Sequence, residues 1–257
     1  MIRVGVIGAT GRMGREVCRA VAADPELALV AAVSHSAPGA TLADAIGLDG
    51  EAGSLALAEH LEQVADAGAE VLVDFTVPSY ASDHVAWGIA NGLHVVVGTT
   101  GFEIDEAWRE APVGVVVAPN FAIGAVLLMR FAEQVARYLP SAEVIELHHD
   151  GKADAPSGTA LLTARRIAAA RGEVPAAPAG DDAYPGARGA DVDGVRVHSV
   201  RLQGLVAHEE VIFGGQGQTL TLRHDSTDRT SFLPGVLLAI KAAPTRPGLT
   251  VGLDELL

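Results

Sequence analysis

The amino-acid sequence predicts an α/β protein: a doubly wound parallel sheet in the first half, then a second α+β domain with a mixed or antiparallel sheet. Three observations support this prediction. Valine-rich runs alternate with helical stretches up to about residue 119, the alternation then stops, and three strand-like segments follow closely after residue 194. Buried parallel strands have nearly continuous apolar sequences, whereas closely spaced strands leave no room for helical crossovers.

Five short apolar runs define the strands of the first half. A single run of this length could equally be a buried helix segment, but five at βαβ spacing are typical of parallel strands. The runs are IRVGVI (2–7), LALVAAV (27–33), EVLVDF (70–75), LHVVVG (93–98) and VGVVVA (113–118).

The second half begins with helix, strand and helix, and the strands that follow are expected to pair antiparallel because they are so close. The first three elements are GAVLLMRFAEQVARYL (124–139), EVIELHH (143–149) and SGTALLTARRIAAAR (157–171), followed by a loop over 172–194. The later strands are VRVHSVRL (195–202), VAHEEVIFG (206–214) and QTLTLRHD (218–225), and a helix, SFLPGVLLAIKAA (231–243), precedes a short tail. We expect a first domain over 1–119, completed by 229–257, and a second over 120–228.

Composition excludes several classes of function. A net charge of −14 without a basic stripe argues against binding to nucleic acid. No apolar run reaches the roughly 18 residues of a membrane span, and the chain enters a strand at once, so we expect neither a membrane segment nor a signal peptide. The single cysteine, Cys18, favours a reducing cytoplasm. Because the net charge is negative, an anionic ligand would have to be attracted by positive groups at its own binding site.

A glycine-rich loop follows the first strand. Gly8, Gly11 and Gly14 form a GxxGxxG pattern between that strand and a helix, REVCRAVAA. Glycines let the backbone turn tightly and approach a pyrophosphate, whose charge then lies at the helix N-terminus. The alternative is a tight turn without a ligand. The position in a βαβ unit favours a dinucleotide site.

The end of the second strand bears on the type of cofactor. An acidic residue that binds the adenine ribose is expected there, but the sequence has Ser34, His35 and Ser36. No carboxylate is present to repel a 2′-phosphate, and Arg12 and His35 could contact one. This favours NADPH, with NADH as the second cofactor. Alternatively, Ser34 and His35 are ordinary loop residues.

Small-residue loops follow the later strands, at DFTVP (74–78), GTTGF (98–102) and APNFAIG (118–124). Ligands of open α/β sheets bind outside these strand ends, although plain turns would have similar sequences. The expected cofactor-binding residues are Gly8, Ala9, Thr10, Gly11, Arg12, Met13, Ser34, His35, Phe75, Thr76, Gly98, Thr99, Thr100, Ala118, Pro119, Asn120 and Phe121.

The stretch ELHHDGKADAPSGTA (146–160) contains one of only two lysines among 18 basic residues, Lys152. A proton donor must titrate near working pH, which lysine can be tuned to do and arginine cannot. Ser157, Gly158 and Thr159 open a helix, so their backbone N–H groups are expected to face an anion. His148 and His149 reach one ligand only if their strand ends or bends here, and Gly151 permits this. The spacing of the two histidines is poor for zinc, so no metal is expected.

Several motifs together resemble the dihydrodipicolinate reductase family. GATGRMG, DFT, VVGTTGF, APNFAIG, ELHHxxKxDAPSGTA and HDSTDRTSFLPGVLLA occur in the family's order over essentially the whole chain. The resemblance implies a Rossmann-like domain, a substrate domain, a homotetramer, and NAD(P)H-dependent reduction of a cyclic dicarboxylate, 4-hydroxy-tetrahydrodipicolinate, on the diaminopimelate route to lysine. It implies acid–base roles for His148 and Lys152, and substrate contacts for His149, Ser157, Gly158 and Thr159. Ser34 stands where the family usually has Glu or Asp.

The sequence also bears on two other functions. A semialdehyde dehydrogenase that forms a thioester needs a nucleophilic cysteine, and Cys18 lies at a packing position of the first helix. A non-catalytic NADP(H)-binding redox sensor would have no reason to keep His148, Lys152 and the Ser157–Thr159 turn.

Overall fold

The computed structural model describes residues 1–172 and 183–257, and part of the expected loop over 172–194 therefore lies outside the described residues. The chain forms two compact units. Unit 1 comprises Met1–Phe121 and Phe232–Leu257, and unit 2 comprises Ala122–Ser231.

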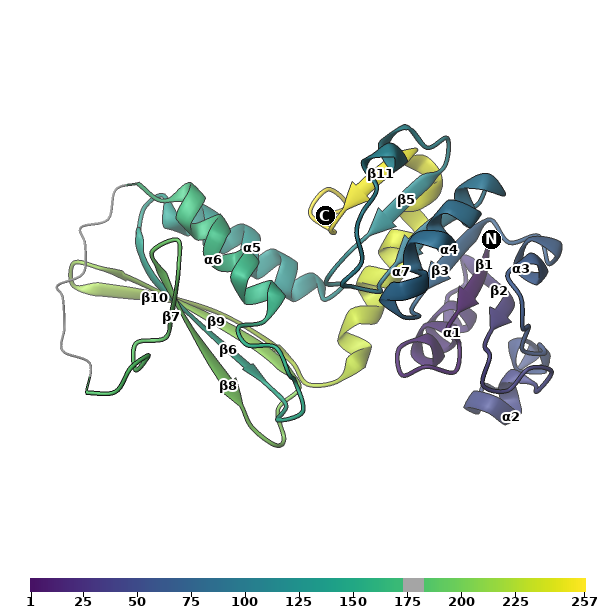
Figure 1. The fold of residues 1–257 in the computed structure, drawn as a ribbon, viewed down its shortest axis with the longest axis horizontal. Helices are drawn as coiled ribbons and strands as arrows, with labels where there is room; N and C mark the ends of the chain where they lie inside the picture. Colours follow the sequence, from purple (N-terminus) through teal and green to yellow (C-terminus); the bar gives the residue numbers. More distant parts are fainter. Residues whose placement is uncertain (173–182) are drawn as a thin grey trace. The chain divides into compact units, whose positions relative to one another are not determined.

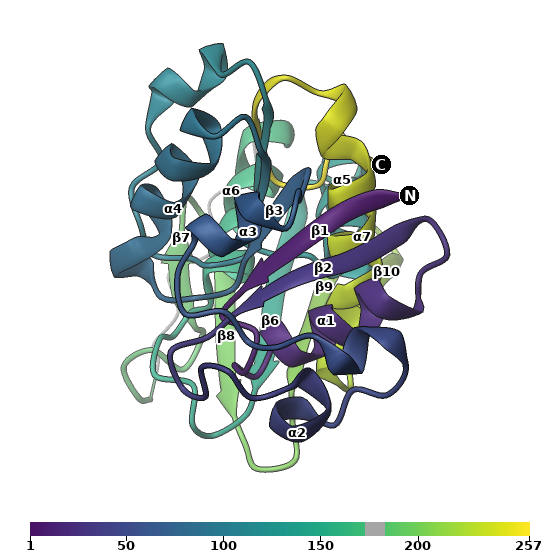
Figure 2. The ribbon, with the colours of Figure 1, turned by 90° about the vertical axis from the view of Figure 1, so that its right-hand side faces the viewer.

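Unit 1 is built on a six-stranded parallel sheet, as the valine-rich runs predict. Its order is β11-β5-β4-β3-β1-β2, and β3, β1 and β2 can be followed side by side in Figures 1 and 2. The strands are β1 Ile2–Ile7, β2 Leu27–Val33, β3 Val71–Asp74, β4 His94–Val97, β5 Gly114–Val117 and β11 Gly248–Val251. β11 was missed, because four residues in the expected tail are too few for a periodic pattern. It pairs with β5 in parallel and forms one edge of the sheet.

Helices cover this sheet. α1 packs against β2 and against α7, and α4 packs against β3 and β4. Valine side chains fill the centre of the sheet because parallel strands are buried on both faces. The helices are α1 Gly14–Ala23, α2 Leu42–Ile46, α3 Glu62–Asp66, α4 Pro78–Ala90 and α7 Leu233–Ala242, with 3₁₀ turns at Glu51–Ser54, Glu106–Glu110, Arg229–Phe232 and Ala243–Thr245.

Unit 2 contains a mixed five-stranded sheet in the order β10-β9-β6-β8-β7. The strands are β6 Ser141–His148, β7 Ala190–Val192, β8 Val195–Arg201, β9 Ala207–Gly215 and β10 Gln218–Ser226. β9 and β10 pair antiparallel as predicted. β8 and β9 do not pair, because β6 lies between them, parallel to β8 and antiparallel to β9. β7 forms within the expected loop and pairs antiparallel with β8.

Two helices, α5 Ile123–Ala136 and α6 Gly158–Ala170, lie side by side over one face of this sheet (Figure 1). Alternate residues of β6 and β9 are buried under them, among them Val144, Val211 and Phe213. Within the described residues no helix covers the opposite face (Figure 1). The alternation of side chains therefore gives this sheet a helix-covered face and an open face.

Candidate active site

In the glycine loop of unit 1, backbone atoms pack so closely against one another that there is no room for side chains at the glycine positions. Gly8, at the end of β1, has a φ of +78°, which favours glycine. A Cβ atom on Gly14 would lie 2.0 Å from the Gly8 carbonyl oxygen, so α1 can begin here only with a glycine. The backbone N–H groups of Arg12 and Met13, just before α1, have no hydrogen-bond partner within the described residues. Unpaired N–H groups at a helix N-terminus suit a phosphate, so the loop fits a dinucleotide.

A cleft of about 560 Å³ opens beside this loop. The predicted residues that line it are Gly8, Thr10, Gly11, Ser34, His35, Phe75 and Thr76. The other lining residues lie outside the expected cofactor-binding set and are Ile7, Val33, Ser36, Glu59, His60, Leu61, Glu62, Val77, Tyr80 and His84. Glu59 to Glu62 were missed because they lie far from any recognisable motif.

The end of β2 has no carboxylate, as the sequence predicts. Ser34 is buried, and its hydroxyl shares a 2.6 Å hydrogen bond with the Thr10 hydroxyl. The Ser36 N–H donates to the same Ser34 oxygen. Arg12 is exposed and is not among the residues that line the cleft. His35 lines the cleft, as do the exposed carboxylates of Glu59 and Glu62.

Asp74, at the end of β3, holds the next loops together. Its side chain is 0% exposed. It accepts hydrogen bonds from the Thr76 N–H and hydroxyl, both at 2.7 Å, and from the Thr99 hydroxyl at 3.2 Å. Nδ1 of His84 on α4 lies 2.7 Å from its other oxygen. Asp74 belongs to the DFTVP segment, but the sequence alone did not predict this role for it. The sequence feature that could have indicated this role is a carboxylate at the end of a strand in the middle of the sheet.

Three of the predicted loops meet around Phe75. A Cβ atom on Gly98 would lie 2.1 Å from the Phe75 ring, so Gly98 leaves the space that the ring fills. The Phe75 and Phe121 rings are 5.9 Å apart between centroids. Thr99 and Ala118 are buried beside them, whereas Thr100 and Pro119 are exposed. The loops after β3, β4 and β5 therefore form one wall, as expected for strand ends of a parallel sheet.

In unit 2, β6 ends at His148, and a turn at Asp150 and Gly151 follows. His148 is half-buried and His149 is exposed. The strand therefore ends between the two histidines, which was the condition for both to reach one ligand.

Glu146 is the centre of the site in unit 2. It is 0% exposed and lies two residues before His148, on the same face of β6. One carboxylate oxygen accepts from His148 Nδ1 at 2.5 Å and from Arg201 at 2.8 Å. The other accepts from Arg201 at 2.8 Å and from the Ser157 N–H at 3.2 Å. One buried carboxylate thus joins β6, β8 and the start of α6.

The charges of this cluster shift two pKa values. Burial raises the pKa of Glu146, but hydrogen bonds from Arg201, Ser199 and His148 outweigh it and hold this pKa below its ordinary value. Burial lowers the pKa of His148; the bond to Glu146 opposes this, and the charges of Lys152 and Arg201 add to it. The net pKa of His148 lies below its ordinary 6.5, so the imidazole is neutral at pH 7. Its Nδ1 proton then belongs to the bond with Glu146, which leaves Nε2 available.

Lys152 is attached to the same cluster through Asp154. Its Nζ lies 2.7 and 2.8 Å from the two carboxylate oxygens of Asp154. Arg201 donates to the Asp154 backbone carbonyl at 2.5 Å. Asp154, which the sequence analysis left without a role, therefore connects Lys152 to Arg201 and so to Glu146. The network therefore connects the lysine, the histidine and the turn at Ser157.

The start of α6 differs from the prediction in one respect. Ser157 caps the helix, because its hydroxyl accepts from the Ala160 N–H at 3.2 Å. Its own N–H donates to Glu146, so it is not available to a ligand. Gly158 is exposed, and a Cβ atom there would meet nothing within 4 Å. The open space before the helix therefore lies at Gly158.

Glu146 and Arg201 were the main omissions of the sequence analysis in unit 2. Glu146 could have been found, because it lies between Val144 and His148 at the two-residue spacing of a strand. The three side chains must therefore share one face of β6, which is the covered face. Arg201 could not, because its position beside β6 depends on the insertion of β6 between β8 and β9.

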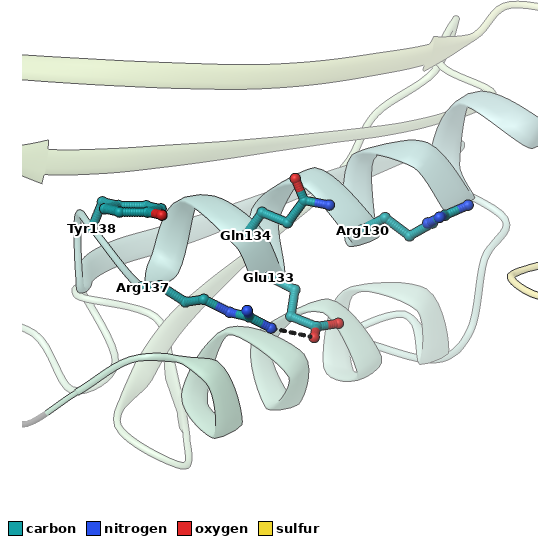
Figure 3. Close-up of a pocket in the computed structure, with 5 residues that line it drawn as sticks. All are labelled: Arg130, Glu133, Gln134, Arg137 and Tyr138. Carbon is teal, nitrogen blue, oxygen red and sulfur yellow. Dashed lines mark ion pairs between the residues drawn. The ribbon is translucent and has the colours of Figure 1, made fainter.

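A second hollow, of about 390 Å³, lies on the outer face of α5 (Figure 3). Its residues are Arg130, Glu133, Gln134, Arg137 and Tyr138, and Arg137 pairs with Glu133 at 3.5 Å. All five come from α5 and the two residues after it, so no second element encloses a ligand there. Within residues 1–172 and 183–257, no three His, Cys, Asp or Glu side chains could together hold a metal ion. No helix in the same residues is long and apolar enough to cross a membrane.

Comparison with known proteins identifies similar chains over the full length. Residues 2–121 match the family model for the dihydrodipicolinate reductase N-terminus, and residues 124–257 match that for its C-terminus. The chain is 53% identical to the 4-hydroxy-tetrahydrodipicolinate reductase of Nocardia farcinica (strain IFM 10152), with coverage of 100% of this chain and 98% of the relative. It is 50% identical to that of Cutibacterium acnes (strain DSM 16379 / KPA171202), with 100% and 99% covered. A dipicolinate-bound dihydrodipicolinate reductase from Paenisporosarcina sp. TG-14 is 40% identical, with a TM-score of 0.87 and both chains fully covered.

Proposed function

This chain belongs to the dihydrodipicolinate reductase family, and on that premise we propose that it reduces 4-hydroxy-tetrahydrodipicolinate to tetrahydrodipicolinate with NAD(P)H, in lysine biosynthesis through diaminopimelate. The observation that carries the proposal is the cluster around Glu146, which joins His148, Lys152 and the start of α6 in one network. A redox sensor would need no such network. Cys18 is buried and burial raises its pKa to about 12, which excludes a thioester mechanism.

Unit 1 supplies the cofactor site. The glycine loop lines the cleft, and the N–H groups of Arg12 and Met13, which have no partner within the described residues, would bind a pyrophosphate. The wall around Gly98 contains the Phe75 and Phe121 rings, which would help to exclude water from a bound nicotinamide ring. A bound nicotinamide dinucleotide supplies the hydride.

Unit 2 supplies the site for the dicarboxylate. The N-terminus of α6 has positive partial charge, and the open space at Gly158 lets a carboxylate approach it. His149 is exposed at the strand end and can contact the same ligand. The ion pair between Arg201 and Glu146 holds the turn before α6 in place. The attraction of a substrate carboxylate then depends on the start of this helix and not on the net negative charge of the protein.

We propose that Lys152 donates the proton and that His148 orients the substrate through Nε2. His148 is neutral at pH 7 because its pKa lies below the ordinary value, so it has no proton to spare beyond the one it shares with Glu146. Lys152 is half-buried, and its ammonium group has three N–H donors. It hydrogen bonds to both carboxylate oxygens of Asp154, which leaves donor capacity for a substrate. An ammonium group so placed can transfer a proton and also balance the substrate's charge.

The experiment that tests the function follows NADPH oxidation by absorbance, with substrate generated by the aldolase that precedes this step. We expect cofactor oxidation that depends on both the aldolase product and this protein. Absence of oxidation with either cofactor, while the aldolase is shown to be active, would contradict the proposal.

For the cofactor, we propose a preference for NADPH. Ser34 is small, buried and bonded to Thr10, so the end of β2 has neither a carboxylate to bind ribose hydroxyls nor one to repel a 2′-phosphate. His35 lines the cleft beside it. Glu59 and Glu62 also line the cleft but are exposed, so solvent screens their repulsion.

For the assembly, we propose a homotetramer in the cytoplasm. The open face of the unit 2 sheet carries half-buried Ile145, Leu147 and Ile212 between ion pairs such as Arg223 with Glu210. Apolar side chains on an uncovered sheet face favour association with another copy. A mass measurement by light scattering at micromolar concentration tests this, and an active monomer would contradict it.

A further inference from the structure

A second buried carboxylate, Glu209 on β9, lies beside Glu146. It is 5% exposed, and the antiparallel register places it directly opposite Glu146. Residues directly opposite in such a pair have their side chains on the same face. Oε1 of Glu209 has no hydrogen-bond partner within the described residues. The reaction proposed above uses Glu146 and leaves Glu209 without a role.

The elements packed against Glu209 offer it no cation. On β10, His224 stands opposite it, and burial lowers the pKa of His224 so that the ring is neutral at pH 7. On α6, the Thr163 hydroxyl donates to the Thr159 carbonyl at 3.0 Å and also hydrogen bonds to Glu209. The buried residues of α5 and α6 include no ionisable side chain. The ionisable groups on the same face beside Glu209 are therefore Glu146 and, diagonally, His148 on β6, and His224 on β10.

The surroundings of Glu209 and Glu146 shift the pKa values of the two carboxyl groups in opposite directions. Burial raises the pKa of Glu209 to about 7; the bond from Thr163 opposes the rise, and the charge of Glu146 adds to it. Glu146, which binds Arg201, keeps a lowered pKa. Below neutral pH the pair therefore carries one negative charge, which resides on Glu146. Because the interaction is mutual, a change of charge on Glu209 must act on the groups bound to Glu146.

We propose that Glu209 is a positioning residue for the reduction: in its protonated form it leaves Glu146 as the single buried anion that orients His148. His148 is a diagonal neighbour of Glu209 across the strand pair, because Glu146 pairs with Glu209 and His148 with Ala207, and such neighbours lie roughly 7–8 Å apart. A second anion at that distance favours the protonated imidazole and so raises the pKa of His148. It would thereby disturb the neutral form that the mechanism requires. The inference rests on the proposed function only through the role of His148.

The test is a pH titration of the ¹⁵N-labelled histidines by NMR, with His148 assigned by comparison with a His148→Asn variant. We expect the His148 signal in the native protein to show its own titration and a second inflection near the ionisation of Glu209. Glu209→Gln keeps the size of the side chain but cannot ionise, so the second inflection should be lost. A His148 titration curve that is the same in the native protein and in Glu209→Gln would overturn the proposal.

Two further variants separate the effect from general changes in charge or folding. Glu210→Gln removes the same charge from the next residue of β9, on the open face where Glu210 binds Arg223, and should keep the second inflection. Thr163→Val removes the bond that lowers the pKa of Glu209, and should move the inflection to higher pH. Loss of the inflection in Glu210→Gln, or no movement in Thr163→Val, would each count against the assignment.

The pH profile of kcat provides the catalytic counterpart. We expect Glu209→Gln to change the alkaline limb of the kcat profile while the KM for the cofactor stays unchanged. A lower kcat with an unaltered pH profile would show a merely structural role and would overturn the proposal. Complete absence of reductase activity in the native protein would contradict the proposed function instead, and the NMR titration would still test Glu209.

Discussion

The cleft in unit 1 and the cluster in unit 2 are built in opposite ways. The cleft depends on backbone: Gly8, Gly14 and Gly98 each stand where a Cβ atom would lie within 3 Å of another atom. The cluster depends on charge: one buried carboxylate, Glu146, holds a cation, an imidazole and a helix start. The first should therefore be sensitive to added atoms and the second to lost charge. Each substitution below affects one region and leaves the other as its control.

The largest expected effect is on catalysis by the cluster. Lys152→Ala should lower kcat by about 10²–10⁴-fold, because it removes the proposed proton donor. Lys152→Arg should not restore activity, since a guanidinium keeps its proton. Steady-state kinetics measures this. The matched control is Lys241→Ala in unit 1, which removes the other lysine, paired with Asp24 and Glu26. A fully active arginine variant would show that charge alone suffices.

Glu146→Gln should destabilise unit 2 by about 3–5 kcal/mol, because Arg201 loses the carboxylate that balances its partly buried charge. Denaturant unfolding measures the loss. Cofactor affinity, determined by titration calorimetry, should remain near the native value because unit 1 is unaltered. An unfolding free energy within about 1 kcal/mol of the native value would mean that solvent, rather than Glu146, stabilises Arg201.

Glu209 should give stability a pH dependence. Its pKa is about 7 in the folded chain against an ordinary 4.5, so the unfolded chain releases this proton first. The carboxyl therefore makes its full contribution to folding below pH 4.5 and loses about 3 kcal/mol as pH rises to 7. Unfolding experiments at about pH 5 and pH 8 should show a smaller difference for Glu209→Gln than for the native chain. Equal differences would contradict the raised pKa.

Gly14→Ala should affect the cleft alone. Its Cβ atom would lie 2.0 Å from the Gly8 carbonyl oxygen, and we expect a cost of about 1–3 kcal/mol in cofactor binding as the loop shifts. Gly11→Ala is the graded comparison, because its Cβ atom would lie 3.0 Å from the same oxygen. Calorimetric affinities should fall in the order native, Gly11→Ala, Gly14→Ala. The NMR signal of His148 should be unchanged in both, and a change would show that the cluster depends on the loop.

The smallest expected effect concerns the choice of cofactor. Ser34→Asp should shift the ratio of kcat/KM for NADPH over NADH by about tenfold toward NADH, the equivalent of one charge-assisted hydrogen bond. The ratio in the native chain should favour NADPH. A native preference for NADH, or an unchanged kcat/KM ratio in the variant, would show that residues 34–36 do not recognise the 2′-phosphate.

The comparison also explains what could be predicted from the sequence. Glycines report backbone geometry directly, so the loop at Gly8 and the wall at Gly98 could be recognised from local sequence. The cluster could be predicted only in part: His148, Lys152 and Ser157 lie within one short segment, but Arg201 and Glu209 reach Glu146 through strand order. That order was wrong in the prediction, because β8 and β9 are close in sequence and yet separated by β6.

The edge strand β11 has a consequence for the synthesis of the chain. Residues Met1–Phe121 emerge from the ribosome first, but the strand that covers β5 and the helix α7 that packs on α1 come after the whole of unit 2. Until residues 248–251 appear, the apolar edge at Val115–Val117 is unpaired and can associate with other chains. The nascent protein therefore has an aggregation-prone interval that lasts until residues 248–251 are made, and a stop codon before Gly248 would make that interval permanent.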